Sequence, residues 1–272
     1  MLHTRMLRTF FSVCTLHALI ITPVYGFSLD TVTGWLSGGK DEEVFIKEYA
    51  LNNPSKGTVE ITNIRGDITV STWSHKKVMV QVSKNGTQNE IKETEVSIAQ
   101  SPSSIKINAE GSSAQVNYTI IQPADTTLKV VVSGQGTIKV KGTTGKVYTS
   151  SHKGDTKLYD NRGQVTAHAE SGNIKIKLDH TFNSSSSLFL KNVSGDVILQ
   201  ALDPFNAQFE GKTHKGKIAS DEIAIMLDPQ KTVLSPEAWK RMQKEVKGSF
   251  GSGGAPITID VENGDIKIEK RQ

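Results

Sequence analysis

Lysine side chains recur at a fixed spacing in the middle of this chain of 272 residues. Two rows with a period of eighteen residues are Lys139, Lys157 and Lys175 and, two positions later, Lys141, Tyr159 and Lys177. Ammonium groups attract anions, and salt shortens the range of that attraction. If the fold places these six side chains on one face, the pattern predicts a docking surface for an anionic polymer, such as an acidic glycan, lipopolysaccharide or teichoic acid.

A second interpretation of the same lysines concerns solubility. Exposed lysines on a β-sheet discourage that sheet from associating with another one. Neighbouring lysines would also repel one another by on the order of 1 kcal/mol per pair in water. A bound polyanion would relieve this repulsion, so the sequence leaves open whether the lysines bind a ligand or only prevent aggregation.

Residue patterns that support catalysis are missing. The histidines of the chain beyond residue 26 are dispersed, and neither a metal-ligand spacing nor a nucleophile elbow is present. Asp155 with Asp160, or Glu170 with Asp179, could form a glycosidase pair. Among 28 acidic residues such pairs arise by chance. We therefore predict no catalytic residues, no cofactor and no metal site, calcium included, because the Gly-Gly-x-Gly-x-Asp repeat is absent.

The elements that would position the lysines follow a repeat of nine residues. Gly136, Gly145, Gly154, Gly163 and Gly172 are nine apart, and apolar and polar residues alternate between them. A short strand followed by a glycine turn, repeated, is typical of a β-solenoid, because glycine accepts positive φ at each corner. With two strands per coil the lysines align on one face. With three they scatter.

Most of the remaining chain also predicts strands, so we expect an all-β fold with one solenoid domain over residues 44–272 and nonapeptide repeats over 136–178. Residues 27–43 form a loose leading segment. One helical insertion is expected within 221–254, because Ser235-Pro236-Glu237 combines an N-cap, a proline at the first helical position and an acid. Trp239, Met242 and Val246 would line its buried face.

The first 26 residues resemble a secretory signal, with Arg5 and Arg8 before the apolar stretch Phe10 to Val24. We expect cleavage near Gly26, the alternative being an uncleaved anchor helix. Cleavage removes the only cysteine, Cys14, and lowers the formal charge from +4 to +2 because two arginines and no acid are lost. The expected product is soluble and either periplasmic or secreted to the cell surface. It has no remaining transmembrane segment and no nucleic-acid partner.

The run from Val116 to Ile176, with its tyrosine strand, Pro-Ala turn and strand–glycine units, resembles the bacterial putative adhesin domain family. Two later pieces, NVSGDVILQ and APITIDVENGDIKIEK, match as well, so the resemblance extends from about Val44 to Lys270. It implies a right-handed, β-helix-like fold in an envelope or surface setting. It supplies no catalytic residues.

These observations favour an exported, non-enzymatic β-solenoid that acts as a binding or adhesin-like module of the bacterial envelope. Its expected partner is an envelope glycan or another anionic polymer. The alternatives are a polysaccharide lyase or glycosidase built on a β-helix, and a periplasmic structural or stress scaffold.

Overall fold

The computed structural model describes residues 30–36, 40–111, 113–179, 182, 185–202, 204–221, 223–227 and 244–271. Its helical elements are the single turn η1 (Pro54–Lys56) and the helix α1 (Gln88–Glu93). All other regular elements are strands: β1 (Asp30–Leu36), β2 (Lys40–Ala50), β3 (Thr58–Arg65), β4 (Ile68–Trp73), β5 (Lys77–Gly86), β6 (Glu95–Ser101), β7 (Ser104–Glu110), β8 (Gln115–Pro123), β9 (Thr127–Gln135), β10 (Ile138–Lys141), β11 (Val147–Lys153), β12 (Thr156–Tyr159), β13 (Gln164–Ser171), β14 (Ile174–Leu178), β15 (Ser187–Ser194), β16 (Val197–Ala201), β17 (Ala207–Lys215), β18 (Ile218–Asp221), β19 (Met226–Leu227), β20 (Glu245–Phe250), β21 (Ala255–Asn263) and β22 (Ile266–Lys270).

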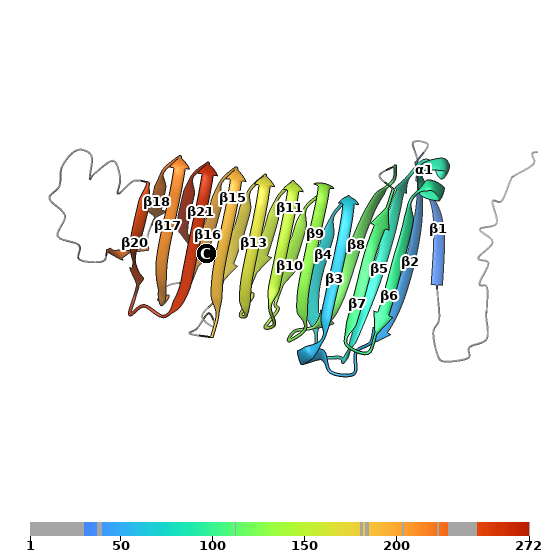
Figure 1. Cartoon of the computed structure of the whole chain (residues 1–272), viewed down its shortest axis with the longest axis horizontal. Coiled ribbons are helices and arrows are strands. Elements are labelled where there is room, and N and C mark those ends of the chain that lie inside the picture. The colour runs from blue at the N-terminus through green and yellow to red at the C-terminus, as the bar shows by residue number, and fades with distance from the viewer. Residues whose placement is uncertain are drawn as a thin grey trace, which may run out of the picture.

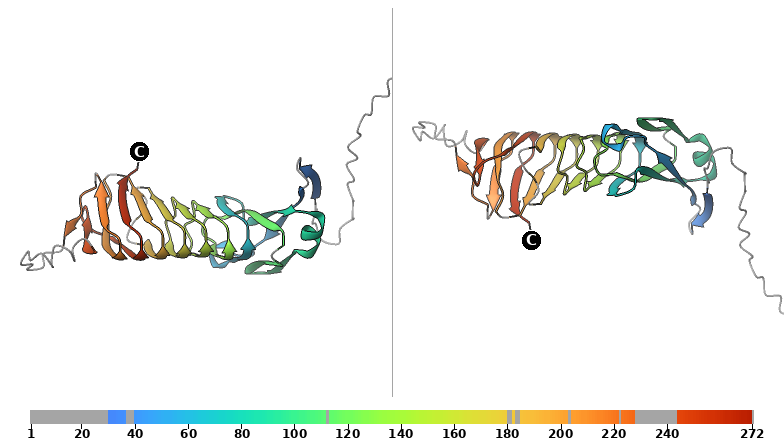
Figure 2. Two further views of the ribbon diagram at one scale, coloured as in Figure 1. Left: turned by 90° about the horizontal axis from the view of Figure 1, so that it is seen from above. Right: turned by 90° about the horizontal axis from the view of Figure 1, so that it is seen from below.

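The strands form two sheets that face each other along a rod. Sheet A has the order β1-β2-β5-β8-β4-β10-β12-β14-β16-β22-β18, and sheet B has the order β19-β20-β17-β21-β15-β13-β11-β9-β3-β7-β6. Figure 1 shows the strands running across the long axis of the rod, and Figure 2 shows the two layers joined by turns. The prediction of an all-β, solenoid-like fold is confirmed.

Each coil of the central tract contains two strands. The chain passes from β9 in sheet B to β10 in sheet A, then to β11 in sheet B and β12 in sheet A, and the strands of each sheet pair in parallel. Residues eighteen apart therefore lie beside each other, as Ile138 does with Thr156 and Ile174. The choice between two and three strands per coil is thus settled for this tract.

The alternation of apolar and polar residues decides which side chains point inward. The aliphatic residues that this alternation places inward in the nonapeptide tract are all at most 3% exposed, and they are Ile138, Val140, Val147, Leu158, Val165, Ile174 and Ile176. They belong to one core that runs through the whole rod. Fully burying one such side chain stabilises the fold by roughly 1.5–3 kcal/mol, so the inward column holds the coils together.

The order of the coils departs from the order of the sequence at both ends. The early coil β3–β4 lies between β7–β8 and β9–β10, since β3 pairs with β7 and β9 and β4 pairs with β8 and β10. The last coil, β21–β22, lies between β15–β16 and β17–β18. Towards each end of the solenoid, strands that are distant in sequence therefore pair with each other.

Two predicted segments differ from the structure. The leading segment 27–43 contains β1 and the first residues of β2, which pair with each other in antiparallel register. In the insertion 221–254, β19 and β20 are strands, so Val246 lies in β20 and not on a helix. It belongs to a strand because β20 pairs antiparallel with β17. Residues 228–243, with Trp239 and Met242, and the signal segment 1–26 lie outside the described residues.

The helix α1 was not predicted, although its start is readable in the sequence. Thr87 accepts a hydrogen bond from the backbone N–H of Glu90, and the Glu90 side chain accepts one from the backbone N–H of Thr87. This reciprocal capping box is the Thr-x-x-Glu signature of a helix N-terminus. At six residues, α1 forms a short connection between β5 and β6.

Candidate functional site

The six residues predicted to form a docking surface lie together on the outer side of sheet A. Lys139 of β10, Lys157 of β12 and Lys175 of β14 are direct partners in the parallel register. Lys141, Tyr159 and Lys177 form the second row in the same three strands. We call these six residues the lysine face. Its side chains point outward because their neighbours in the alternation, such as Leu158, fill the core.

Tyr159 lies between two of the lysines. The Lys177 ammonium is 5.4 Å from the centre of the Tyr159 ring, and the Lys139 ammonium is 5.9 Å from it. Both distances fall within the range of cation–π attraction. The aromatic ring thus offsets part of the repulsion between ammonium groups on adjacent strands, which are about 4.8 Å apart.

One carboxylate lies close to the lysine face. Asp155 Oδ2 is 3.8 Å from the Nζ atom of Lys157, in an ion pair whose two side chains are both more than one-third exposed. Among the described residues, no ion pair is found for the other four lysines of the face. The face therefore keeps an excess of positive charge, and solvent weakens its one ion pair.

The lysine face is three strands wide. On one side, Thr69 of β4 is the register partner of Lys139. On the other side, Ile198 and Gln200 of β16 are the partners of Lys175 and Lys177. The next lysine along the sheet, Lys267, is neutralised by an ion pair with Asp196, and the hydrogen bond from Lys267 holds the pKa of Asp196 below its usual range.

The outer side of sheet B has a different character. Tyr148 and Phe189 are 40% and 48% exposed there, in one row with Thr166 between them. Lys129 of this side is hydrogen-bonded to Glu60, which raises the pKa of Lys129 and lowers that of Glu60. Lys129 is therefore paired, whereas no ion pair is found among the described residues for Lys191 of β15 and Lys212 of β17 on the same side.

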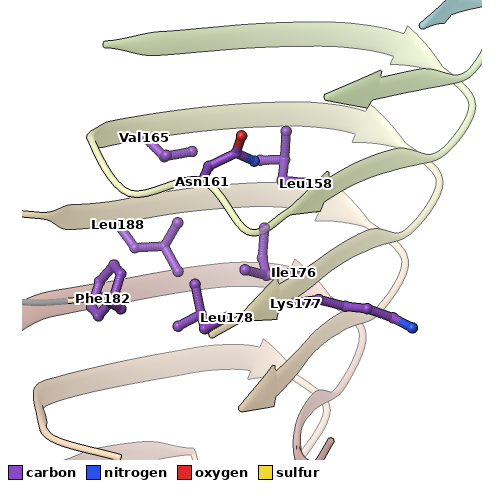
Figure 3. A pocket seen from close by; sticks show the side chains of 8 residues that line it. All are labelled: Leu158, Asn161, Val165, Ile176, Lys177, Leu178, Phe182 and Leu188. Carbon is purple, nitrogen blue, oxygen red and sulfur yellow. The ribbon is translucent and has the colours of Figure 1, made fainter. Parts of the chain in front are cut away.

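One hollow in the interior of the described coils is too small for a ligand. A small hollow between the coils is lined by apolar side chains and by Asn161, and it leaves no room for a water molecule. Figure 3 shows Leu158, Ile176 and Leu178 pointing into this hollow while Lys177 extends away from it. This hollow is therefore part of the packed core and not a binding site.

The carboxylate pairs considered for glycoside hydrolysis are engaged elsewhere. Each of the four acids has a basic partner: Asp155 pairs with Lys157, Asp160 with Arg271, Glu170 with His152 and Asp179 with Arg162. In the described ranges, no three His, Cys, Asp or Glu side chains gather to hold a metal ion. Each of these acids therefore takes part in an ion pair of the fold.

One concave site was missed by the sequence analysis. A groove with a volume of about 540 Å³ lies where η1, the end of β4 and the β8–β9 turn meet. We call it the Trp73 groove, and it is lined by Asn52, Asn53, Pro54, Ser55, Trp73, Ser74, His75, Lys76, Pro123, Ala124, Asp125 and Thr144. The available sequence signal was a tryptophan that ends a strand directly before the polar turn Ser-His-Lys.

Comparison with known proteins identifies the family. A family model described as Toastrack DUF4097 matches residues 55–269, which is most of the chain. The chain belongs to the Toastrack DUF4097 family. The resemblance to the putative adhesin domain family is thereby confirmed. No curated protein matches this Toastrack chain in sequence.

Solved structures similar to this Toastrack chain include three from bacteria. A putative cell adhesion protein from Clostridium sporogenes ATCC 15579 is 11% identical with a TM-score of 0.47, over 85% of this chain and 100% of that one. A putative adhesin from Bacteroides fragilis NCTC 9343 is 10% identical with a TM-score of 0.37, over 83% and 96%. A putative lipid binding protein from Parabacteroides distasonis ATCC 8503 is 11% identical with a TM-score of 0.31, over 87% and 98%.

Helices that could cross a membrane are not found in the described part of the Toastrack chain.

Proposed function

We propose that this Toastrack protein is an exported, non-enzymatic binding module that holds an anionic polymer against its lysine face. The observation that carries the proposal is the register of β10, β12 and β14, which aligns five lysines on three adjacent strands. One of the five has a carboxylate partner within the described residues. An acidic glycan or a phosphate-bearing envelope polymer is the class of ligand that this face suits.

The rigidity of the solenoid supports this proposal. The lysines stand on parallel strands with a fixed spacing of about 4.8 Å, so little conformational entropy of the backbone is lost when a polymer binds. Repulsion of on the order of 1 kcal/mol per lysine pair is relieved at the same time. The right-handed sense of the coil, which the family resemblance implies, is part of the proposal.

Binding to polygalacturonate, which carries one carboxylate per sugar, tests the lysine face. We expect calorimetry to detect weak binding at about 0.01 M salt, where the Debye length is about 30 Å, and loss of binding at about 1 M, where it is about 3 Å. Lys157→Glu combined with Lys175→Glu should abolish binding at low salt, because it reverses the charge of two of the five lysines of the face, on the adjacent strands β12 and β14.

A matched control makes the same change of charge on sheet B. Lys191→Glu combined with Lys212→Glu alters the outer side of β15 and β17, away from the lysine face. This control should retain the binding of polygalacturonate. If both double variants bind like the unaltered protein, or if nothing binds at low salt, the lysines serve solubility alone and the proposal is wrong.

Export is the second part of the proposal, and it rests on the residues of the signal-like segment. We expect the mature protein to begin at or near Phe27, because Val24 and Gly26 suit the peptidase. N-terminal sequencing of the periplasmic or secreted protein checks this. A membrane-embedded product that begins at Met1 would contradict the soluble, exported form.

A further inference from the structure

The Trp73 groove has walls that the fold holds in place before any ligand arrives. Trp73 is the register partner of Pro123, at the end of sheet A strands β4 and β8. The backbone N–H groups of Thr144 and Gly145 both donate to the carbonyl oxygen of Ala124, at 2.7 and 3.0 Å. These contacts fix two of the turns that line the groove, so a ligand need not organise them.

The indole ring of Trp73 is itself fixed. Its Nε1–H donates to the carbonyl oxygen of Lys77 at 2.7 Å, which satisfies the only polar group of the side chain. His75 meets the ring edge-on, with 4.8 Å between the ring centres and 76° between the ring planes. The half-buried Trp73 therefore offers the groove an apolar surface without an unsatisfied donor.

Polar groups surround this apolar surface. Asp125 and Asn52 are exposed, and no hydrogen-bond partner of either side chain is found in the described part of the chain. Asn53 accepts a hydrogen bond from the Ser55 hydroxyl at 2.7 Å, which leaves its amide N–H groups for other partners. The groove thus combines carboxylate and amide acceptors with amide donors.

Charge narrows the class of ligand. The lining residues include one lysine, Lys76, and one acidic residue, Asp125. Their charges cancel, so the groove has no excess of positive charge that would select a polyanion. A suitable ligand is uncharged, has one apolar face that covers an indole ring, and carries several hydroxyl groups at its edge. A pyranose ring has these properties.

We propose that the Trp73 groove binds a neutral pyranose unit of a glycan, stacked on Trp73 and hydrogen-bonded by Asp125 and Asn52. Its volume of about 540 Å³ lies within the range of small-molecule sites, roughly 300–1,000 Å³. The site is separate from the lysine face, since it lies at the corner beyond β4 and β8 and not on β10, β12 and β14. It needs no anionic ligand, so it stands independently of the proposed function.

Calorimetric titration of the purified protein with cellotriose, maltotriose and N-acetylchitotriose tests the site. We expect millimolar binding of at least one of these neutral sugars, with little change at high salt. Trp73→Ala and Asp125→Ala should each weaken that binding at least tenfold, whereas Trp73→Phe should retain part of it because an aromatic face remains. Circular dichroism establishes that each variant is folded.

Two controls separate this site from the rest of the protein. Tyr148→Ala removes an exposed aromatic ring on sheet B, and Lys157→Glu combined with Lys175→Glu removes charge from the lysine face; both should leave sugar binding unchanged. Asp125→Ala and Asn52→Ala alter exposed side chains and report on the groove even if Trp73→Ala fails to fold. Failure of all three sugars to bind, or unaltered binding by the Asp125 and Asn52 variants, would overturn the proposal.

Discussion

Gly154 illustrates how strictly single residues of this solenoid are determined by the backbone around them. Its φ is +128°, and a Cβ atom built on it would lie 2.3 Å from the carbonyl oxygen of Gly136 in the preceding coil. No real Cβ contact is this short, so any side chain forces adjacent coils apart. The same close approach to backbone recurs at the other four glycines of the period, whereas positive φ, expected at every corner, is found only at Gly154 and Gly172 among the five. The nine-residue period of glycines therefore reflects a steric requirement of coil stacking first, and turn conformation at two of its corners.

We predict that Gly154→Ala lowers the free energy of unfolding by several kcal/mol, because strain and a backbone clash combine. Gly253→Ala is the matched control, since Gly253 also has a positive φ, +78°, but its nearest neighbour would be 3.7 Å from the Cβ. That control should cost about 1–2 kcal/mol, from the left-handed conformation alone. Chemical denaturation measures both values, and equal losses would show that the stacking of the corners tolerates a side chain.

At the scale of elements, adjacent coils are joined at this corner by a ladder of side-chain hydrogen bonds. The backbone N–H of Asn173 donates to Asp155 Oδ1, that of Asp196 donates to Asn173 Oδ1, and that of Asp265 donates to Asp196 Oδ1, at 2.9 to 3.0 Å. Each side chain thereby satisfies a turn amide of the next coil. This explains why Asp or Asn follows so many of the corner glycines.

The ladder predicts a dependence of stability on pH. The Lys267 side chain, and then the Asp265 amide, lower the pKa of Asp196 from its ordinary value of 3.8. Because the pKa is lower in the folded state, the stabilisation is present above pH about 4 and is lost as the pH falls through the folded value. Asp196→Asn keeps the acceptor oxygen but not the charge, so its stability should fall less between pH 5 and pH 3, about the range in which Asp titrates.

Urea denaturation of the unaltered protein, Asp196→Asn, Lys267→Met and the double variant at both pH values provides the measurement. Lys267→Met should reduce the acid sensitivity in the same way. The double variant should be little different from either single variant, because both changes remove the same interaction. Acid sensitivity that is the same in all four proteins would mean that the Asp196–Lys267 pair does not contribute.

At the scale of the whole molecule, the C-terminal coil is inserted between two coils that precede it in the sequence. β21 pairs with β15 on one side and β17 on the other, and β22 pairs with β16 and β18. The buried aliphatic residues of this coil are Ile257, Ile259, Val261, Ile266 and Ile268. At roughly 1.5–3 kcal/mol each, they contribute about as much as the entire stability of an ordinary domain, about 5–15 kcal/mol.

We therefore predict that a chain truncated after Gly254 loses the order of its neighbouring coils as well as that of the deleted strands. Amide hydrogen exchange should be fast in β15, β16 and β17 but remain slow in β10 and β12, because each coil of a solenoid depends mainly on its neighbours. A peptide of residues 255–271 added in trans should restore protection in β15. Protection in β15 to β17 equal to that of the full chain would contradict the structural role of this coil.

The sequence alone determined the local features of this protein. The all-β class, the phase of the strands, the inward position of residues such as Leu158 and the outward position of Lys157 follow from alternation with a period of two, which is a property of neighbouring residues. The six residues of the lysine face could be named for the same reason. Their alignment remained conditional, because a nine-residue period is compatible with two or three strands per coil.

Only the tertiary structure decided which strands lie beside each other. The pairing of β3 with β9 joins residues about 70 positions apart, as Thr58 with Thr127, and no local pattern specifies such a partner. The strand character of residues 30–36 and 245–250 likewise depends on partners elsewhere in the chain. The sequence offered Trp73 as a signal but could not locate the Trp73 groove, because its walls come from turns that meet only when coils distant in sequence stack. Alternation determines the side of the sheet to which a side chain points. Backbone hydrogen bonds between strand edges are the same for every residue, so they do not specify which strands pair. The packing of the whole core decides that pairing.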